Sequence, residues 1–227
     1  MTRIAAWSLQ VSVPTLLEAV TGRARRAVCD DRIAWWSRRM VDEVGARIEV
    51  VGREHLEDRA PAVVMSNHQS HYDIPVLYQL LPGSVRMVAK KELFDIPIFG
   101  PALRAAEFIE VDRGDRAKAI ESLQGARRLI ESGITVWIAP EGTRSLDGRL
   151  GEFKKGGFIL AEDAGVPILP VSIEGTRNIL PAKTAKIQYG QQVRVTVHPR
   201  VKRADAASRA EWIERVRSVI ASGLTHR

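Results

Sequence analysis

Short apolar runs alternate with stretches of helical spacing along most of the chain. The run at 62–65 is partly β-branched and ends in a polar cluster, after which Ile74, Leu77 and Leu81 follow at helical spacing. This pattern predicts a buried strand, a turn and a helix. A further apolar run at 85–89 continues the order as strand, helix, strand, which is typical of βαβ units in a mostly parallel sheet.

The remaining pattern extends the same fold. We expect further strands at 47–51, 108–111, 134–139 and 168–172, and helices over 119–130, up to Ala164, and over 205–221. Residues 94–101 are expected to form a loop interrupted by Pro and Gly, and 186–198 a hairpin at the sheet edge. The sequence therefore predicts an α/β fold: a single αβα domain with a mostly parallel mixed sheet flanked by helices.

Residues 31–45 have the pattern of an amphipathic helix. Asp31 suits its N-cap, and one helical face carries the apolar side chains Ile33, Trp36, Met40 and Val44. Two interpretations of this face stay open: it lies in a membrane interface, or it packs on the domain core. Residues 3–21 lack the uninterrupted run of about 20 apolar residues that a spanning helix needs, and they fit a secretory signal poorly.

The composition is that of an ordinary globular protein, with 45% apolar and 27% charged residues. The single cysteine, Cys29, has no partner for an intramolecular disulfide. The net charge of +7 implies acidic partners: membrane phospholipid, nucleic acid, an acidic carrier protein or a phosphorylated substrate. The excess lies at both ends, +4 in 1–39 and +7 in 183–227. No nucleic-acid-binding signature accompanies it, so we expect no nucleic acid partner.

The polar cluster after the run at 62–65 is the first candidate site, since ligands usually bind at the carboxyl edge of α/β sheets. It contains Asn67, His68, His71 and Asp73. Residues five apart on a regular helix point away from each other, so His68 and Asp73 meet only if His68 lies in the turn before the helix. An Asp that accepts the Nδ1 proton leaves Nε2 free as a general base, and the attacking group can then be the substrate's own hydroxyl.

Two other interpretations of the cluster stay open at this point. Ser70 and Asp73 also have the spacing of a helix capping box, in which case the histidine only satisfies backbone groups. His68, His71 and Asp73 are close enough to serve as metal ligands, although no further His or Cys cluster supports a metal site.

Charged residues follow the other expected strands as well. Arg113 follows the strand at 108–111, and Glu141 and Arg144 follow the one at 134–139. If they converge on the edge that holds His68, the arginine forks suit bidentate binding of a phosphate. Singly, each charge is more often solvated or in a surface ion pair. A P-loop is excluded, since its glycine and lysine pattern does not occur.

The ordered motifs resemble a known family. Ser-Asn-His-Gln-Ser-His-Tyr-Asp at 66–73 resembles the first block of the glycerolipid acyltransferases, in particular the bacterial 1-acyl-sn-glycerol-3-phosphate (lysophosphatidic acid) type. Residues 90–100 are similar to the lysine-containing lead to the second block, and 108–113 to that block itself. Pro-Glu-Gly-Thr-Arg-Ser at 140–145 matches the third block and 166–171 the fourth. Four blocks in order, over roughly residues 45–200, are far more specific than any one of them.

This resemblance implies acyl transfer from acyl-CoA or acidic acyl-carrier protein to a lysophospholipid hydroxyl, giving phosphatidic acid without a metal or cofactor. His68 would be the general base and Asp73 its orienting partner. The residues implied in substrate binding are Lys90, Arg113, Glu141, Gly142, Thr143, Arg144 and Pro167. One alternative is a related enzyme with another acceptor, such as a lyso-ornithine lipid. The alternative from another class is a non-catalytic basic module that binds membranes.

The resemblance also suggests how the chain is organised. We assign 1–46 to an N-terminal amphipathic helical segment for membrane association and 47–227 to the acyltransferase catalytic domain. The expected location is the cytoplasmic face of the cell membrane, with peripheral or monotopic attachment to the phospholipid surface.

Overall fold

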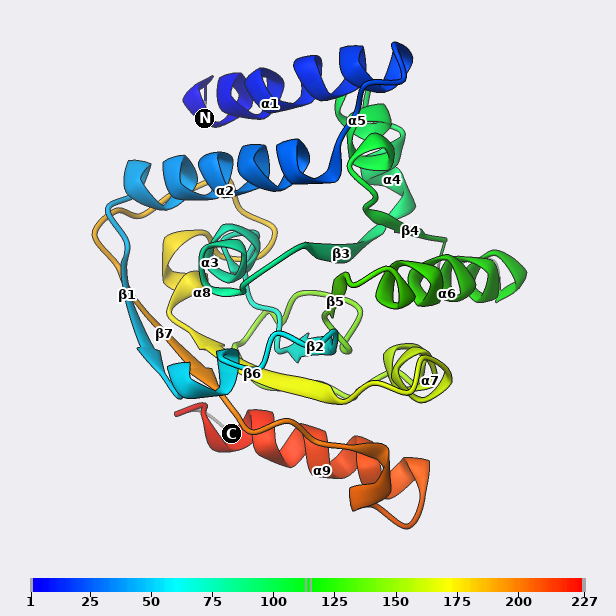
Figure 1. Ribbon diagram of the computed structural model, residues 1–227. Coiled ribbons are helices and arrows are strands. Elements are labelled where there is room, and N and C mark those ends of the chain that lie inside the picture. The colour runs from blue at the N-terminus through cyan, green and yellow to red at the C-terminus, as the bar shows by residue number, and fades with distance from the viewer. Residues whose placement is uncertain (1, 113, 115, 226–227) are drawn as a thin grey trace.

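A mixed β-sheet forms the centre of the computed structural model, which describes residues 2–112, 114 and 116–225 (Figure 1). In these residues the sheet has seven strands, in the order β1-β7-β6-β2-β5-β3-β4. The strands are β1 (Arg47–Val51), β2 (Val63–Ser66), β3 (Val85–Lys90), β4 (Ile109–Val111), β5 (Thr135–Ile138), β6 (Ile168–Glu174) and β7 (Gln192–Val197). Neighbouring strands are parallel, except the antiparallel pair β6 and β7. The predicted α/β fold with a mostly parallel mixed sheet is confirmed.

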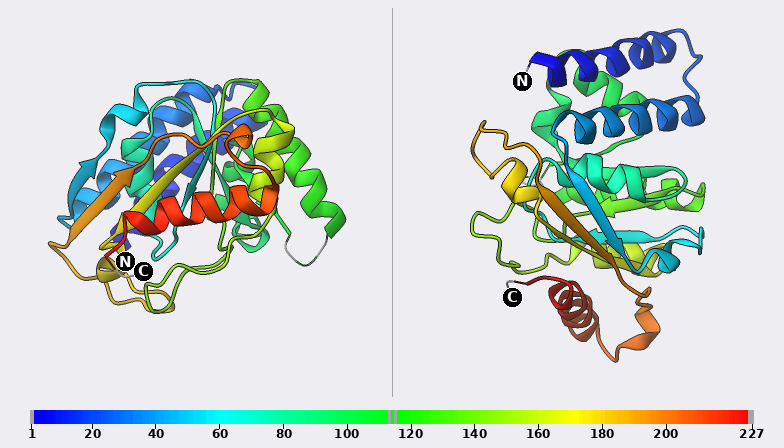
Figure 2. Two further views of the ribbon diagram at one scale, coloured as in Figure 1. Left: turned by 90° about the horizontal axis from the view of Figure 1, so that it is seen from below. Right: turned by 90° about the vertical axis from the view of Figure 1, so that its left-hand side faces the viewer.

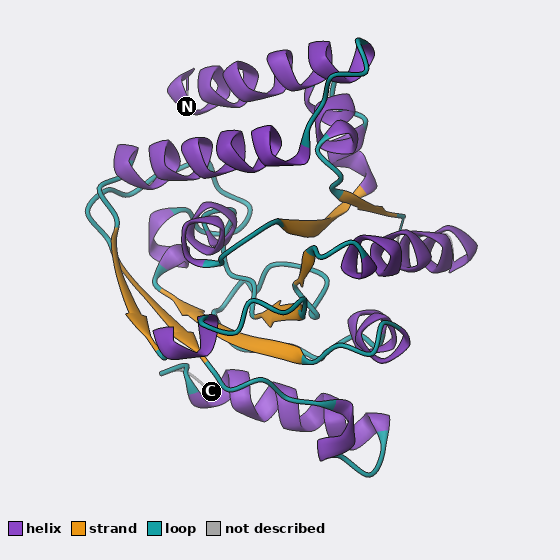
Figure 3. Ribbon diagram, in the orientation of Figure 1, coloured by secondary structure: helices purple, strands orange, loops and turns teal. Residues whose placement is uncertain are grey.

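Helices cover both faces of the sheet (Figure 3). They are α1 (Thr2–Val20), α2 (Arg26–Glu43), α3 (Asp73–Leu80), α4 (Lys91–Phe94), α5 (Phe99–Ala105), α6 (Arg116–Glu131), α7 (Gly156–Asp163), α8 (Thr176–Ile179) and α9 (Arg209–Ser222), with short 3-10 turns η1 (Arg53–Leu56) and η2 (Arg203–Asp205). Buried side chains of α2 and α3 pack on one face, and those of α6, α7 and α9 on the other. None of the helices in the described ranges is long and apolar enough to cross a membrane.

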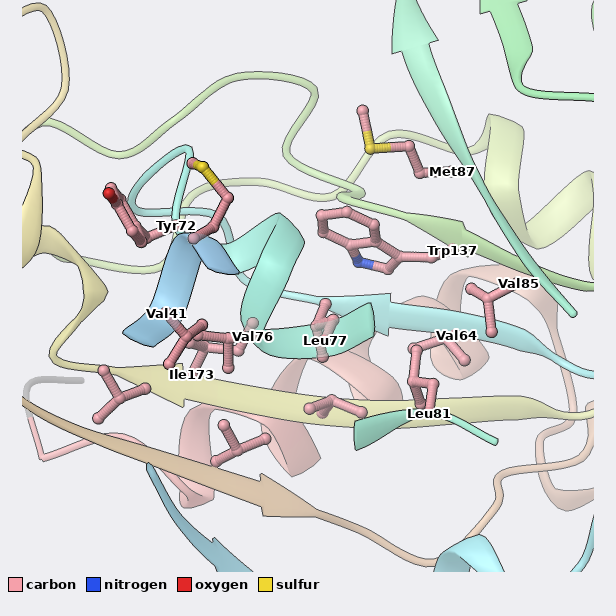
Figure 4. Close-up of a cluster of buried hydrophobic side chains, with 14 of the residues drawn as sticks. Val41, Val64, Tyr72, Val76, Leu77, Leu81, Val85, Met87, Trp137 and Ile173 are labelled. Atoms are coloured by element: carbon pink, nitrogen blue, oxygen red, sulfur yellow. The ribbon is translucent and has the colours of Figure 1, made fainter. Parts of the chain in front are cut away.

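Strand β2 shows why the apolar runs are continuous. Val64 faces the cluster under α2 and α3, whereas Val63 and Met65 face the cluster under α6 and α7. Successive side chains in a strand point to opposite faces, so a strand covered on both sides is apolar at every position. Figure 4 shows the first cluster, in which Val64, Leu77 and Trp137 lie between the sheet and α3.

The N-terminal helices lie stacked above one face of the sheet (Figure 2). Met40 of α2 and Val44, the C-cap residue of this helix, are buried in the core, so this part of the amphipathic face packs on the domain. Helix α1 lies outside α2 and also contacts α5. Its outer side leaves large apolar side chains open to solvent, among them Leu17, which is 62% exposed, and Val20, which is 79% exposed.

The start of α2 corrects one prediction. Asp31 is not the N-cap, because the helix begins at Arg26. Ion pairs hold the first turn against the sheet: Arg26 Nε lies 2.7 Å from Glu107 Oε2, and Arg86 Nη1 lies 2.6 Å from Asp30 Oδ1. These long-range contacts extend the helix upstream of the position that local capping preference indicates.

Two further local predictions were wrong. The expected loop at 94–101 includes parts of the short helices α4 and α5, where Pro101 falls in the first turn of α5 and therefore removes no intrahelical hydrogen bond. The expected hairpin at 186–198 is also absent from the described residues. Only β7 is a strand there, and it pairs with β1 and β6 instead. Its alternating pattern indicated a strand but not the strand's partners.

Candidate active site

The carboxyl ends of the parallel strands β2, β3 and β5 meet at one edge of the sheet. The loop 67–72 leaves β2 at this edge, Lys90 ends β3, and the loop that contains Glu141 and Arg144 follows β5. The structure thus brings the predicted residues of these three loops to the same edge. Arg113 lies outside the described residues.

Asn67 fixes the direction in which the chain leaves β2. Its side-chain amide donates to Ile173 O and accepts from Ile173 N, both at 2.8 Å. Asn67 is 2% exposed, and these two bonds continue the pairing of β2 with β6 beyond the last residue of β2. Two well-paired buried hydrogen bonds restrain the following residue, His68.

His68 and Asp73 form the expected pair. His68 Nδ1 lies 2.7 Å from Asp73 Oδ2, and this same oxygen accepts from the backbone N–H groups of Gln69 and Ser70, at 2.8 and 3.0 Å. Asp73 is fully buried. An oxygen that accepts from two backbone groups takes an Nδ1–H donor as its third partner, so the free Nε2 of His68 is the acceptor.

The contacts of this cluster also bear on the two other interpretations, a helix capping box and a metal site. Asp73 receives bonds from the turn that precedes α3, and Ser70 Oγ accepts from Tyr72 N at 3.1 Å and donates to Leu180 O at 2.8 Å. These hydrogen bonds stabilise the turn before α3. They are formed in addition to the hydrogen bond between His68 and Asp73. Among the described residues, no group of three or more His, Cys, Asp or Glu side chains is placed to hold a metal ion.

Trp137 of β5 forms one wall against the imidazole. The rings of His68 and Trp137 meet edge to face, with centroids 6.4 Å apart and an interplanar angle of 89°. Trp137 Nε1 donates to Ser66 Oγ at 3.0 Å, which fixes the indole. Sequence reasoning missed this contact, because a Trp inside an apolar strand is indistinguishable from an ordinary core residue.

Glu141 ties the loop after β5 to the backbone of His68. Its Oε1 accepts from His68 N at 2.9 Å, and its Oε2 accepts from Gly151 N at 2.8 Å. Ser145 N completes the connection by donating to His68 O at 2.8 Å. Burial raises the pKa of Glu141 above its usual value. Both carboxyl oxygens of this predicted substrate-binding residue are therefore engaged with backbone groups.

The remaining predicted residues differ in their surroundings. Lys90 and Thr143 are exposed, Arg144 is half-buried, and Gly142 has a φ of 72°, in the region that favours glycine. Pro167 is not brought to this edge: its carbonyl accepts from Val63 N, at the amino-terminal end of β2.

His71 lines an apolar cavity and is also influenced by the charge of Arg144, in the loop after β5. One side of its ring is open to solvent, but surrounding protein atoms and then the charge of Arg144 lower its pKa to about 4. His71 is therefore neutral at physiological pH.

The apolar cavity has a volume of about 370 Å³. Its walls come from α1, α2, α3 and α5, with Trp36, Met40 and Leu103 among the apolar side chains, and His71 and Tyr72 of the loop after β2 also line it. The cavity thus begins beside the His68 loop. Sequence reasoning did not find it, since its walls come from helices that are far apart in the chain.

The fold and the site together define a class of protein: an α/β domain that presents a histidine paired with a buried aspartate at the carboxyl edge of its sheet, beside an apolar cavity. A family model described as Acyltransferase matches residues 47–174. The chain belongs to this acyltransferase family, as its motifs predicted.

Individual relatives agree with the family match. The chain is 37% identical to a chloroplastic 1-acyl-sn-glycerol-3-phosphate acyltransferase of Brassica napus, over 67% of this chain and 44% of that protein. The alpha form of the human enzyme is 38% identical over 66% of this chain and 54% of its own length. The enzyme of Chlamydomonas reinhardtii is 32% identical over 96% of this chain and 68% of its own length. The chain spans about half the length of the first two.

A solved structure shows the same fold. The crystal structure of the 1-acyl-sn-glycerophosphate (LPA) acyltransferase PlsC from Thermotoga maritima matches with a TM-score of 0.76 at 30% identity. The match covers 87% of this chain and 79% of that one.

Proposed function

We propose that this protein transfers an acyl group from acyl-CoA or acyl-carrier protein to the free hydroxyl of 1-acyl-sn-glycerol-3-phosphate, forming phosphatidic acid. The observation that carries the proposal is the 2.7 Å contact between His68 Nδ1 and Asp73 Oδ2, in the segment whose His71 and Tyr72 line the apolar cavity. The names of the relatives support the choice of acceptor.

The proposed reaction needs one base. With Nδ1–H donated to Asp73, His68 Nε2 takes the proton of the acceptor hydroxyl while that oxygen attacks the thioester carbonyl carbon. The tetrahedral intermediate then collapses, the carbon–sulfur bond breaks, and the imidazolium returns the proton to the thiolate. The products are an ester and a free thiol. A positioned base contributes about 10²- to 10⁴-fold to such a rate, and Asp73 stabilises the imidazolium.

The substrate contacts follow from charge and apolarity. In this proposal the phosphate and glycerol of the acceptor bind at motif residues of this edge, Lys90, Gly142, Thr143 and Arg144, together with Arg113, which is assigned from the sequence. Glu141 supports these residues through its backbone contacts, and Pro167 lies at the amino-terminal end of β2. Support is strongest for Arg144, which has no carboxylate partner among the described residues. The cavity of about 370 Å³ suits a hydrocarbon chain, because its lining is almost entirely apolar.

The decisive experiment measures thiol release from palmitoyl-CoA with and without lysophosphatidic acid. We expect acceptor-dependent release by the wild type and its loss in His68→Ala. His55→Ala is the matched control, since η1 follows β1, whose carboxyl end lies at the opposite edge of the sheet. Turnover of only a phosphate-free acceptor, such as a lyso-ornithine lipid, would overturn the acceptor assignment. No release with either CoA or carrier-protein donors would overturn acyl transfer itself.

We further propose that residues 1–46 attach the protein peripherally to the cytoplasmic face of the membrane. Leu17 and Val20 on the outer side of α1, and the exposed pairing of Arg39 with the Trp35 ring, 5.5 Å from its centroid, suit an interfacial helix. The double variant Leu17→Glu, Val20→Glu is expected to sediment less with anionic liposomes. Val51→Glu, an exposed apolar position on β1, is the control. Equal sedimentation of all three proteins would remove this proposal.

A further inference from the structure

The side chain of Lys154 lies across the backbone of Gly142. A Cβ atom at Gly142 would be 3.1 Å from both Cε and Nζ of Lys154, and 3.2 Å from Cδ. The end of the Lys154 side chain therefore contacts the loop after β5, although the residue is exposed. Only a residue without a side chain leaves this space open.

The backbone of Lys154 is fixed to the same loop. Lys154 N donates to Pro140 O at 2.9 Å, so its main chain and its side chain both contact the segment 140–142. Glu141, between these two contacts, accepts from His68 N at 2.9 Å. The Lys154 ammonium is thus held on the loop that contacts the backbone of the proposed base.

The charge of Lys154 is not compensated. Among the described residues no carboxylate lies within ion-pair distance of its Nζ, and both oxygens of Glu141 are occupied by backbone N–H groups. Lys91, near the same edge, is by contrast paired with Asp112 at 3.3 Å. Arg144, two residues beyond Gly142, also has no carboxylate partner in the part of the chain that the structure describes. Two uncompensated cations on one glycine-containing loop favour the binding of an anion there.

We propose that Lys154 binds the phosphate of the acceptor together with Arg144, and that Gly142 is required to keep its ammonium in place. This inference rests on the proposed acyl transfer and names the group that would select a phosphorylated acceptor. In 1-acyl-sn-glycerol-3-phosphate, two carbons and one ester oxygen separate the reacting hydroxyl oxygen from the phosphorus. A phosphate on the Gly142 loop therefore leaves the hydroxyl within reach of His68.

The test compares Lys154→Met with Lys155→Met, which removes the same charge from the adjacent lysine; both lysines are exposed. In Lys154→Met the KM for lysophosphatidic acid is expected to rise about 10- to 100-fold, the usual loss for a charge-assisted hydrogen bond. The KM for palmitoyl-CoA and the rate with monoacylglycerol, which has no phosphate, should stay the same. Lys155→Met should resemble the wild type throughout.

Gly142→Ala provides a second variant, because its new methyl group would lie 3.1 Å from Cε and Nζ of Lys154. The φ of 72° at this position means that the substitution also strains the loop backbone. If Gly142 acts through Lys154, the two substitutions combined should raise the acceptor KM no more than Lys154→Met does alone. Additive effects would show that Gly142 acts on the acceptor independently of Lys154, and would overturn that part of the inference.

The outcomes separate this inference from the proposed function. If the wild type acylates lysophosphatidic acid but Lys154→Met leaves its KM unchanged, or Lys155→Met raises it equally, Lys154 does not bind the phosphate and the function stands. If the wild type does not acylate lysophosphatidic acid, the function fails, and calorimetric titration with glycerol 3-phosphate decides on the site. Binding that disappears in Lys154→Met supports an anion site, whereas equal binding or none in both proteins overturns it.

Discussion

Replacing Glu141 by Gln tests whether this residue positions His68 or contacts the acceptor. Glu141 accepts two backbone hydrogen bonds, from His68 N at 2.9 Å and Gly151 N at 2.8 Å, and is only 7% exposed. The amide has the same shape, but it offers one acceptor and turns an NH₂ group toward the other backbone N–H. One buried donor is then left unpaired.

The expected loss of stability follows from these two bonds. An unpaired buried group costs about 1–3 kcal/mol, and changing the second bond from charge-assisted to neutral costs about 1 kcal/mol more. We therefore expect the free energy of unfolding of Glu141→Gln to fall by about 2–4 kcal/mol. Because the His68 backbone loses its support, kcat should also fall, while the KM for the acceptor stays nearly unchanged.

The pH dependence gives a second readout of the same substitution. Burial raises the folded-state pKa of Glu141 above 4.5. The stability that this group contributes is therefore fully present at low pH and is lost as the pH rises through the folded-state pKa. The stability difference between wild type and Glu141→Gln should accordingly narrow as the pH rises.

Urea denaturation over a range of pH, combined with steady-state kinetics, measures both effects. Glu152→Gln is the matched control, since Glu152 is an exposed glutamate in the same loop. Wild-type stability together with a tenfold or greater rise in acceptor KM, about 1.4 kcal/mol of lost binding, would refute this reasoning and make Glu141 a direct ligand of the acceptor.

Three other substitutions test hydrogen bonding and packing in the domain. Asn67→Ala removes both hydrogen bonds to Ile173 and should lower the free energy of unfolding by about 2–4 kcal/mol in urea denaturation. His198→Gln removes the imidazole that forms the 2.8 Å hydrogen bond with Ser172. Because burial lowers the folded-state pKa of His198 below 6.5, the wild type should lose thermal stability as the pH falls below 6.5. The variant should lose less stability over the same pH range. Gly100→Ala places a Cβ 2.0 Å from a backbone oxygen, so soluble, folded protein should be strongly reduced in expression trials.

The local part of the site could be predicted from the sequence. His68 and Asp73 are five residues apart, and the strand, turn and helix pattern around them allows one arrangement in which they meet. The shared edge of β2, β3 and β5 was also predictable, because parallel strands place their carboxyl ends together. The family motifs added the residues assigned to the acceptor.

Features that depend on distant partners were not predictable. The start of α2 depends on ion pairs with Glu107 and Arg86, far along the chain, and β7 pairs with the edge strand β1, which no local pattern indicates. The apolar cavity has the same origin, since its walls come from helices near the N-terminus and from α5.

The sequence by itself determined the layered α/β fold, the acyltransferase family and the pair of His68 with Asp73, because apolar periodicity and short motifs act between neighbours in the chain. Only the tertiary structure decided which charges are compensated. In the folded chain both oxygens of Glu141 accept hydrogen bonds from backbone groups, and the side chain of Lys154 contacts Gly142. The physical reason is that a side chain's partners depend on which loops come into contact in the folded chain. The spacing of residues along the sequence does not indicate these contacts.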